Sequence, residues 1–410
     1  MRRKHSSKRR GYALLAAMAI SGVILALGTA MVMMTMREQA SSIAQGDITS
    51  LRCLAEAGID SAFEKLSHDP TWRCAGAPAD FTNKPVNVVI SGQNRTLGTF
   101  TVDPIQDLGG DCVAVTAHGY FPSATAAIHQ EKQVRVIGYK KWGTPFSAAA
   151  FGKAGVPLAN GDTDSYNSAA GSYSGQTPGN NGDIRTDSSS PGAITIYNQG
   201  HCNGRVMYGP GTDLTQVNLD RSRIADGDTN ESNDIQVANA AAIAPDVDVP
   251  STARPISDLT HGANSILGSM FIPAGTWWCN TISITGNSRV TTSGKVTLYA
   301  KGAIVIGGNG MVNNSDAVGG IALPSNLIIY GTPTCTSVKI DGNGSLTAAV
   351  YAPEADIILN GGGNNGAVYG ALAGRTVSFN GNGTVLHYDT ALQGVSGVVV
   401  GFRSKTWEEQ

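Results

Sequence analysis

The chain has 410 residues, a formal net charge of −2 and only 15% charged residues. This length allows two or three domains with sizeable cores. The near-zero charge, with basic residues concentrated at the N-terminus, excludes a nucleic-acid-binding surface on the remainder. Glycine contributes 51 residues, about twice its usual share, which indicates a turn-rich, mainly β protein with helix mostly near the N-terminus.

The segment 12–36 contains no ionisable side chain apart from the phenol of Tyr12. As a helix it is long enough to cross a hydrocarbon core of ~30 Å, so we expect a transmembrane helix. Basic residues precede it, and the positive-inside rule then keeps 1–11 in the cytoplasm. The sequence predicts a single-pass bacterial inner-membrane protein with its C-terminal bulk in the periplasm or at the cell surface. A cleaved signal peptide is the alternative, although its apolar region usually spans only ~7 to 15 residues.

The basic segment 1–11 ends in Lys8-Arg9-Arg10-Gly11 and continues as Tyr12-Ala13-Leu14-Leu15. This string resembles a prepilin leader, which implies cleavage between Gly11 and Tyr12. Most pilins carry Glu at the fifth mature position, where this chain has Ala16, and minor pilins lack that Glu too. The N-terminus is most similar to PilX-type pilus assembly proteins. The resemblance implies pilin-like subunits or assembly proteins as partners, beside the inner membrane.

Residues 37–68 are predicted to continue the helix beyond the span. Apolar residues recur there at steps of three and four and form one stripe, and Pro70 ends the pattern. Segment 54–59, Leu-Ala-Glu-Ala-Gly-Ile, resembles the stretch that follows the span in PilX-type sequences. The stripe consists of Ala44, Ile48, Leu51, Ala55, Ile59, Ala62 and Leu66.

Residues 69–142 change to an alternating pattern. Four strands are predicted at 86–88, 99–102, 112–117 and 133–136, separated by turns rich in glycine, asparagine and proline. The resemblance to pilins implies that they form a small antiparallel sheet on the helix, a pilin-like α+β stem.

From 143 to 393, short alternating strands are punctuated by Gly-Asn turns. The clearest turns recur at close to twenty residues, within the ~20 to 50 range of solenoid repeats. A rung that cannot bury its apolar face alone must stack on neighbours ~4.8 Å away. We therefore predict a single-stranded β-solenoid (β-helix) with a surface excursion at 213–270. A β-sandwich, with turns every ~8 to 12 residues, is the alternative, and 394–410 is predicted as a C-terminal strand and cap.

The C-terminal third resembles the uncharacterised exported domains often fused to PilX-type N-termini. That family has no assigned activity to transfer. The residues that carry the resemblance are Gly275-Thr276-Trp277-Trp278, Leu327-Ile328-Ile329-Tyr330-Gly331, Tyr351-Ala352-Pro353-Glu354-Ala355 and His387-Tyr388-Asp389.

Six cysteines are present, none in a CxxC pair or at zinc spacing from a histidine, so no metal site is predicted. Because the exported side of a membrane is oxidising, we predict disulfides between Cys74 and Cys112 and between Cys202 and Cys279. Small buried thiols are an equal alternative.

The string His387-Tyr388-Asp389 is the strongest catalytic candidate. Alternation puts His387 and Asp389 on one strand face and Tyr388 on the other. We favour a structural end-cap role and predict no catalytic residue and no cofactor. Trp277 and Trp278 are candidates for stacking on a sugar ring, but alternation normally turns one of two adjacent strand residues into the core.

Asp226, Asp228 and Asn230 have the spacing of the first ligands in a calcium-binding loop. Glu231 stands where that loop needs glycine, so we predict no calcium site there.

The predicted function is structural and non-enzymatic: a minor pilin or assembly component of a pilus-like or secretion apparatus, with adhesive contacts to surface polysaccharide. The alternative is a polysaccharide-cleaving β-helix enzyme, for which Glu354, Asp356 and Arg375 are the nearest approach to a paired-carboxylate site. A third candidate, a bactofilin-like cytoskeletal polymer, requires a cytoplasmic solenoid.

Overall fold

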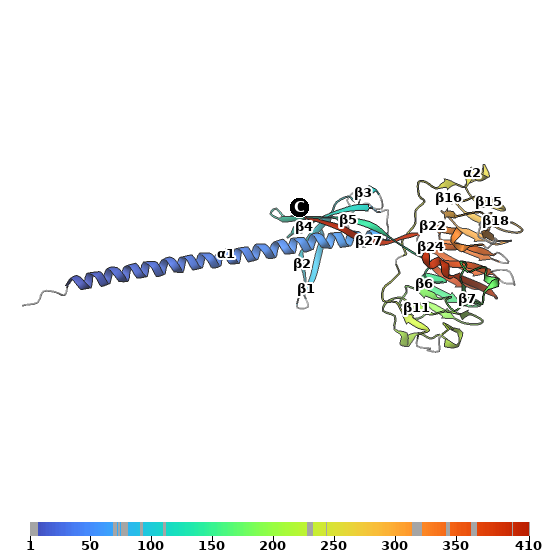
Figure 1. Cartoon of the computed structure of the whole chain (residues 1–410), viewed down its shortest axis with the longest axis horizontal. Coiled ribbons are helices and arrows are strands. Elements are labelled where there is room, and N and C mark those ends of the chain that lie inside the picture. The colour runs from blue at the N-terminus through green and yellow to red at the C-terminus, as the bar shows by residue number, and fades with distance from the viewer. Residues whose placement is uncertain are drawn as a thin grey trace, which may run out of the picture. The chain divides into compact units, whose positions relative to one another are not determined.

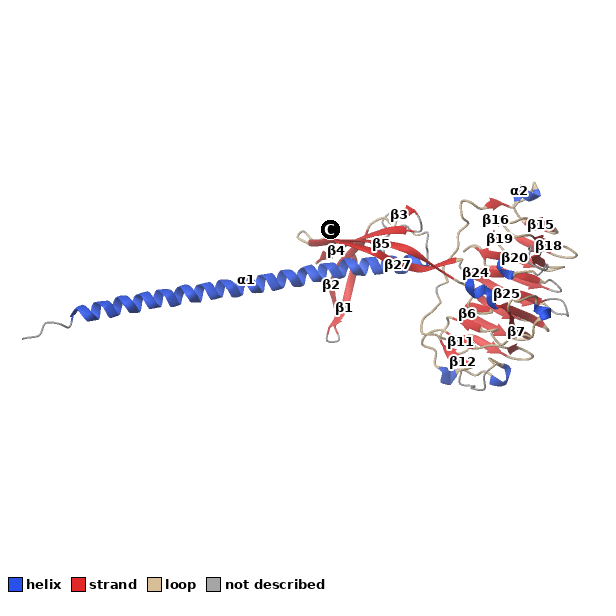
Figure 2. Cartoon of the chain, in the orientation of Figure 1, coloured by secondary structure: helices blue, strands red, loops and turns tan. Residues whose placement is uncertain are grey.

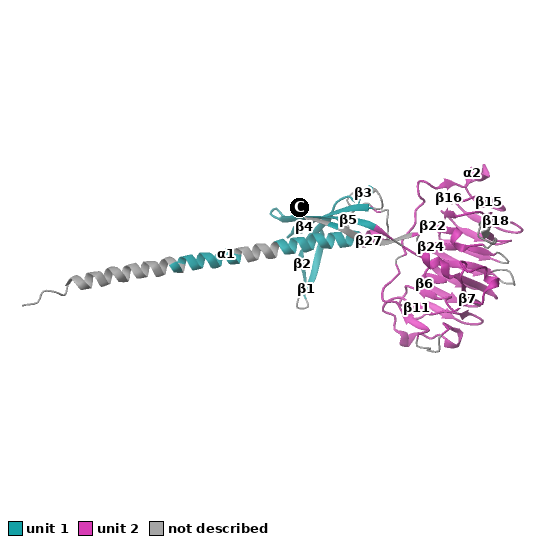
Figure 3. Cartoon of the chain, in the orientation of Figure 1, with its two compact units in different colours: residues 1–62, 73–139, 404–410 teal, residues 63–72, 140–403 magenta. Residues whose placement is uncertain are grey.

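The computed structural model describes residues 7–68, 72, 74, 81–90, 93–109, 112–227, 233–242, 244–313, 322–341, 345–361, 367–395 and 397–409. The chain divides into two compact units (Figure 3). Unit 1 comprises 1–62, 73–139 and 404–410, and unit 2 comprises 63–72 and 140–403. As predicted from composition, the protein is mainly β (Figure 2).

Unit 1 is built from a long helix and an antiparallel sheet (Figure 1). The sheet order is β1-β2-β4-β5-β27, with β3 pairing β4, and the four predicted strands fall within β1, β2, β4 and β5. The elements are α1 Ser7–His68, β1 Lys84–Ile90, β2 Gln93–Val102, β3 Gln106–Gly109, β4 Cys112–Phe121, β5 Gln130–Gly143 and β27 Val398–Glu409.

Glycines let the second half of α1 approach the sheet closely. A Cβ on Gly119 of β4 would lie 2.3 Å from the carbonyl oxygen of Leu51, and one on Gly98 of β2 would lie 2.6 Å from Cδ1 of Leu54. The predicted apolar stripe is buried over its later part but not at Ile48, which is 56% exposed. The buried members are Leu51, Ala55, Ile59, Ala62 and Leu66.

The predicted transmembrane helix at 12–36 is overturned by the structure. Crossing a membrane requires ~20 consecutive apolar residues. Among the residues that the structure describes, no helix is both long and apolar enough. Where the side chains of α1 are described, the apolar run ends at Met36 and is followed by Arg37 and Glu38. The predicted single-pass localisation in the inner membrane is corrected accordingly, and the side chains of 12–26 lie outside the described residues.

Unit 2 is dominated by strands β6–β26, which pair in parallel and which we call the parallel stack. The register shifts at a bulge in the β24–β25 pair and at another in the β25–β6 pair. Parallel pairing also excludes the alternative β-sandwich. The strands are β6 Ala150–Leu158, β7 Gly161–Tyr166, β8 Ile184–Thr186, β9 Ile194–Ile196, β10 His201–Cys202, β11 Val206–Tyr208, β12 Ile235–Val237, β13 Arg254–Pro255, β14 Ile266–Leu267, β15 Met270–Ile272, β16 Gly275–Cys279, β17 Ile282–Ile284, β18 Val290–Thr292, β19 Val296–Ala300, β20 Ile304–Ile306, β21 Met311–Asn313, β22 Leu327–Gly331, β23 Ser337–Asp341, β24 Leu346–Asn360, β25 Ala367–Phe379 and β26 Thr384–Asp389.

Short helical turns connect these strands. They are η2 Tyr173–Gly175, η3 Leu214–Gln216, η4 Arg221–Arg223, α2 Ser257–Thr260, η5 Pro324–Asn326 and η6 Thr390–Gly394.

The interior of the stack is lined by columns of β-branched residues from successive strands. One column runs through Ile282, Ile304, Val338, Ile357 and Val377, each at most 1% exposed. Their partners in alternation point outward, so each strand contributes one apolar face to a shared core.

The predicted fold class is wrong in a second respect, because the stack is not one single-stranded solenoid wound in chain order. β25 pairs β6 and β26 pairs β7, so the last strands of the unit lie beside its first strands. Two chain segments therefore meet inside the stack, with β12 at the far end of one and β13 at the far end of the other. The physical reason is that the edges of β25 and β6 satisfy each other's backbone groups.

Residues 238–253, which we call the strap, connect β12 to β13. Arg185 donates to the carbonyl of Ala240 at 3.2 Å, and the amide of Ala242 donates to Asp187 at 2.8 Å. The hydroxyl of Tyr351 donates to the carbonyl of Pro245 at 2.7 Å. The strap lies within the predicted 213–270 excursion, and strands β12, β13 and β14 occupy other parts of that range.

The two connections that lead into and out of the stack are hydrogen-bonded to each other. The amide of Gly397 donates to the carbonyl of Gly143 at 3.2 Å, and the hydroxyl of Thr144 donates to the carbonyl of Leu392 at 3.1 Å. In the chain, the stack is thus inserted between β5 and β27. Residues 394–410, predicted to cap the solenoid, end instead in β27 of the antiparallel sheet, because β5 offers that strand a backbone partner.

We expect Gly119→Ala to destabilise unit 1 by about 1–3 kcal/mol, because the new methyl group meets the backbone of α1. Denaturant unfolding, followed by circular dichroism, measures the loss. Gly192→Ala is the matched control, since nothing lies within 4 Å of its Cβ position, and it should change stability by less than about 0.5 kcal/mol. Equal effects of the two substitutions would contradict the close helix–sheet contact.

Candidate functional site

The string His387-Tyr388-Asp389 lies at the end of β26, between β25 and β7. The alternation predicted from the sequence is confirmed at Tyr388, which is 1% exposed in the core and donates from its hydroxyl to the carbonyl of Phe146 at 2.7 Å. His387 takes the outer face of the stack, where the 167–180 loop covers it. This cluster is the candidate functional site.

His387 is hydrogen-bonded to an aspartate that the sequence analysis did not single out. Its Nδ1 lies 2.7 Å from Oδ1 of Asp164, its register partner on β7. The hydroxyl of Tyr173 donates to Oδ2 of the same carboxylate at 2.6 Å. The side chains of His387 and Asp164 are only 9% and 11% exposed, so both carboxylate oxygens of Asp164 are engaged in a largely dry environment.

Aromatic rings surround the His387–Asp164 pair. The Tyr173 ring lies 3.7 Å from the imidazole between centroids, and the Tyr369 ring lies 4.9 Å from it. Burial, reinforced by the hydrogen bond to Asp164 and its negative charge, raises the pKa of Tyr173 well above its usual value. Tyr173 is therefore a neutral phenol that donates to the carboxylate.

Asp389 anchors the start of the same loop. Its Oδ1 accepts from the amide of Ser168 at 2.9 Å, and its Oδ2 accepts from the hydroxyl of Ser168 at 2.6 Å. Oδ1 also accepts from the amide of Ala391 at 3.1 Å. The carboxylate is fully buried, and its bonds hold the loop to the end of β26.

A histidine oriented by an aspartate is the arrangement of a general base, which also needs a reacting group within hydrogen-bond reach. Here the hydroxyl of Tyr173 donates to Asp164 rather than to the imidazole, and the Tyr173 ring lies against the imidazole. The geometry thus suits a clamp that fixes the 167–180 loop. It is not the end cap expected from the sequence, because β26 lies between β25 and β7 inside the stack.

Glu354 and Asp356, the carboxylates of the alternative enzymatic reading, are each paired with a cation. Lys153 of β6 lies 2.5 Å from Oε1 of Glu354. Arg375 and the hydroxyl of Thr376 both donate to Asp356. The sequence identified only Arg375, because Lys153 is 201 residues from Glu354 in the chain and reaches it only through the pairing of β6 with β25.

Of the two adjacent tryptophans, one points into the core and the other points outward, as alternation along a strand predicts. Trp277 is 1% exposed in the core, and the guanidinium of Arg254 lies 3.9 Å from its ring centroid. Trp278 points outward, with the Lys301 ammonium 4.0 Å from its ring centroid. Arg254 belongs to the terminal strand β13, so its side chain covers part of the apolar end of the stack.

The six cysteines all lie within the described part of the chain. Cys74 is buried, with its thiol 3.5 Å from the carbonyl of Val102, whereas Cys112 lies on β4. Cys202 and Cys279 are register partners of Thr163 and Ala300 in different strand pairs, and burial raises the pKa of each to about 12. The two disulfides stay predictions.

The remaining sequence motifs lie partly beyond the described residues. Asp228 and Asn230 of the calcium-loop imitation are outside them. Gly11 and Tyr12 fall in the part of α1 whose side chains are not described, so leader cleavage stays a prediction. Within the described residues, no group of three or more His, Cys, Asp or Glu side chains could hold a metal ion.

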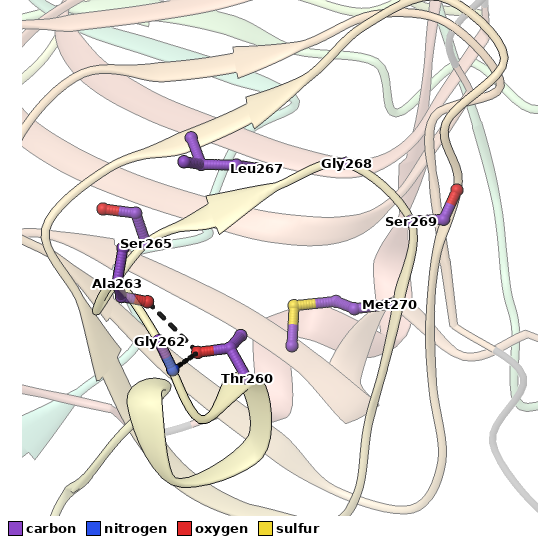
Figure 4. A pocket seen from close by; sticks show the side chains of 8 residues that line it. All are labelled: Thr260, Gly262, Ala263, Ser265, Leu267, Gly268, Ser269 and Met270. Carbon is purple, nitrogen blue, oxygen red and sulfur yellow. Dashed lines mark hydrogen bonds between the residues drawn. The ribbon is translucent and has the colours of Figure 1, made fainter.

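A pocket of about 220 Å³ lies beside the terminal strands β14 and β15 (Figure 4). Its lining carries hydroxyl groups but no titratable side chain, and the Thr260 hydroxyl already donates to the carbonyl of Ala263 at 3.1 Å. The pocket therefore contains no side chain that could act as a general acid or base. It is lined by Thr260, Gly262, Ala263, Ser265, Leu267, Gly268, Ser269 and Met270.

Unit 1 contains a histidine cluster that the sequence analysis missed. Nδ1 of His118 lies 2.6 Å from Oε1 of Glu131, and its Nε2 lies 3.1 Å from Oδ2 of Asp103. Burial acts to lower the pKa of His118, but the hydrogen bonds to the two carboxylates and their negative charges outweigh it. The pKa is therefore raised, and the imidazole ring of β4 connects Glu131 of β5 to Asp103, which follows β2.

Comparisons with known proteins add limited information. The model of a family described as "Domain of unknown function (DUF7305)" matches residues 279–395. No curated protein matches the chain. Among solved structures, the competence-associated pilin ComZ from Thermus thermophilus is similar at 11% identity and a TM-score of 0.27, over 88% of this chain and 97% of that one. A likeness this weak carries no argument about function.

We expect Asp164→Asn to loosen the 167–180 loop, because the charged acceptor shared by His387 and Tyr173 is lost. Faster amide hydrogen exchange across 167–180 and a loss of about 1–3 kcal/mol of stability would report it. Asp162→Asn is the matched control: Asp162 lies on the same strand and contacts His201 at 3.3 Å, but both side chains are well exposed, so little should change. An unaltered loop in Asp164→Asn would refute the clamp.

The stability of unit 1 should fall as pH rises from about 6.5 through the raised pKa of His118. A raised folded pKa stabilises the folded state below the unfolded value of 6.5, and that contribution disappears once the folded imidazolium deprotonates. We expect a loss of about 0.5–1 kcal/mol, because the carboxylates are partly exposed. Denaturant titrations at several pH values measure it, and His118→Gln should remove this part of the slope. An unchanged slope in the variant would contradict the assignment.

Proposed function

We propose that this protein is a structural, non-enzymatic component of a type IV pilus-like or type II secretion-like assembly, with adhesive contacts through the parallel stack. The observation that carries the proposal is the construction of unit 1. A 62-residue helix begins near a prepilin-like leader, and its second half lies against an antiparallel sheet through glycine contacts. This is the helix-plus-sheet arrangement that the resemblance to pilins implied.

The residue at the fifth position after the leader favours a minor rather than a principal subunit. A principal subunit uses a glutamate there to pair with a neighbour's N-terminal ammonium inside an apolar filament, where an unpaired charge is costly. Ala16 cannot make that pair. A subunit of this kind suits the initiation or the assembly of a filament rather than its repeated interior.

The electrostatics of unit 2 support a structural role. Glu354 and Asp356 are each engaged by a cation, and both oxygens of Asp164 are hydrogen-bonded within the protein. Carboxylates neutralised in this way hold strands and loops together. The polysaccharide-cleaving alternative needs a carboxylate pair that is available to substrate.

Co-expression of the full chain with a prepilin peptidase tests the proposal. We expect N-terminal sequencing and intact mass to find a product that begins at Tyr12, and Gly11→Val to abolish its formation, because a valine side chain blocks a peptidase site that accepts glycine. Gly46→Val, another glycine of α1, is the control and should leave processing unchanged. Recovery of intact Met1 from the unsubstituted chain would reject a prepilin-type component.

A further inference from the structure

Asparagine directly precedes glycine at several corners of the parallel stack. In such a pair the backbone amide nitrogen of the glycine can attack the side-chain amide carbon of the asparagine, because glycine carries no Cβ that would shield the nitrogen. In a folded chain this reaction depends on hydrogen bonds, since both groups must move and a bond that holds either one must first break. The pairs within the described residues are Asn160-Gly161, Asn181-Gly182, Asn203-Gly204, Asn309-Gly310, Asn360-Gly361, Asn380-Gly381 and Asn382-Gly383.

In all but the last of these pairs, one of the two reacting groups is hydrogen-bonded to another part of the stack. The backbone amide of Gly182 donates to the carbonyl of Asn203 at 2.8 Å, and that of Gly381 donates to the carbonyl of Leu359 at 3.3 Å. In the other pairs the side-chain amide of the asparagine donates at 2.9–3.1 Å, and these asparagines are Asn160, Asn203, Asn309 and Asn360. Each of these corners is therefore held to a neighbouring strand or turn.

The pair Asn382-Gly383, in the turn between β25 and β26, lacks this restraint. Both residues are exposed, and nothing lies within 4 Å of the Cβ position of Gly383, whose φ is +70°. Neither the side-chain amide of Asn382 nor the backbone amide of Gly383 is hydrogen-bonded to any residue that the structure describes. The turn is closed by the amide of Thr384, which donates to the carbonyl of Gly381 at 3.3 Å, longer than usual. Rotation of Asn382 toward Gly383 therefore disturbs one weak hydrogen bond.

We propose that Asn382-Gly383 is a self-modification site, at which Asn382 is deamidated through a cyclic imide. The backbone nitrogen of Gly383 gives up its proton and forms a bond to Cγ of Asn382, and the bond from Cγ to Nδ2 breaks as ammonia leaves. Water then adds to one of the two imide carbonyls and breaks its bond to the nitrogen, which leaves an aspartyl or an isoaspartyl linkage. Water is the only co-reactant, and no atom is oxidised or reduced.

The modified turn differs from the original by a negative charge and, in the isoaspartyl form, by an extra methylene group in the backbone. β26 begins at Thr384, so the change falls outside the paired residues of the stack. Exposed turns of this kind accept covalent change without loss of the fold. Because water does not restore the amide, the modified fraction increases with the age of the molecule.

Peptide mapping by mass spectrometry of the full chain, incubated in a mildly alkaline buffer, tests the proposal. We expect deamidation at Asn382 to be faster by roughly fivefold or more than at Asn203 and Asn360, because a hydrogen bond holds the side chain of each of these internal controls. Asn382→Gln should abolish the fast reaction, since attack on the longer side chain requires a larger ring. Equal rates at Asn382 and at the two controls would overturn the proposal.

The same measurement on the chain unfolded in urea separates the effect of structure from that of local sequence. Unfolding removes the restraining hydrogen bonds, so Asn203 and Asn360 should then react at nearly the same rate as Asn382. If Asn382 kept its full advantage in the unfolded chain, local sequence rather than the open turn would be responsible, and the proposal would be overturned. The proposal does not depend on leader processing, so it and the proposed function can fail separately.

Discussion

The structure of unit 2 depends on one constraint: a short strand with one apolar face is stable only when neighbours cover that face and pair both edges. Strands of three to five residues cannot meet this requirement alone. Columns such as Ile282-Ile304-Val338-Ile357-Val377 show how it is met, because each residue buries its side chain against the one before and the one after. The two ends of the stack are where the constraint is hardest to satisfy.

Joining the last strands to the first removes one place where edges would be exposed. With β25 beside β6 and β26 beside β7, the chain begins and finishes the stack at its interior, and Gly143 and Gly397 can be hydrogen-bonded. Because β12 and β13 lie at opposite ends of the stack, the chain needs a long connection between them, and the strap is that connection. Its polar contacts with Arg185, Asp187 and Tyr351 supply partners for a backbone that has no strand ladder of its own.

The same closure creates the polar sites of the unit. His387 reaches Asp164, and Lys153 reaches Glu354, only because strands far apart in the chain are register partners or near neighbours at this junction. Charged groups at the junction are consequently paired, and they hold a loop or a bulge in place. At the β14–β15 end, by contrast, no strand in the described part of the chain pairs the outer edge.

Local patterns in the sequence predicted what depends on neighbours along the chain. Alternation placed Tyr388 on the opposite strand face from His387 and one of the two adjacent tryptophans in the core, the helical stripe placed Ala55 and Ile59 on one face of the helix, and the four strands of the stem were located. These features follow from periodicities of 3.6 and 2 residues, which any segment carries by itself. The transmembrane prediction rested on local hydropathy alone, and the described part of α1 does not sustain it.

Only the tertiary structure decided the order in which strands stack, the pairing of β27 with β5 and the partners of His387, His118 and Glu354. Strands with similar apolar faces and similar lengths can stack in many orders that bury nearly equal apolar area. The order is decided by which strand edges pair their backbone groups and by the register between strands far apart in the chain. No short stretch of sequence contains that information.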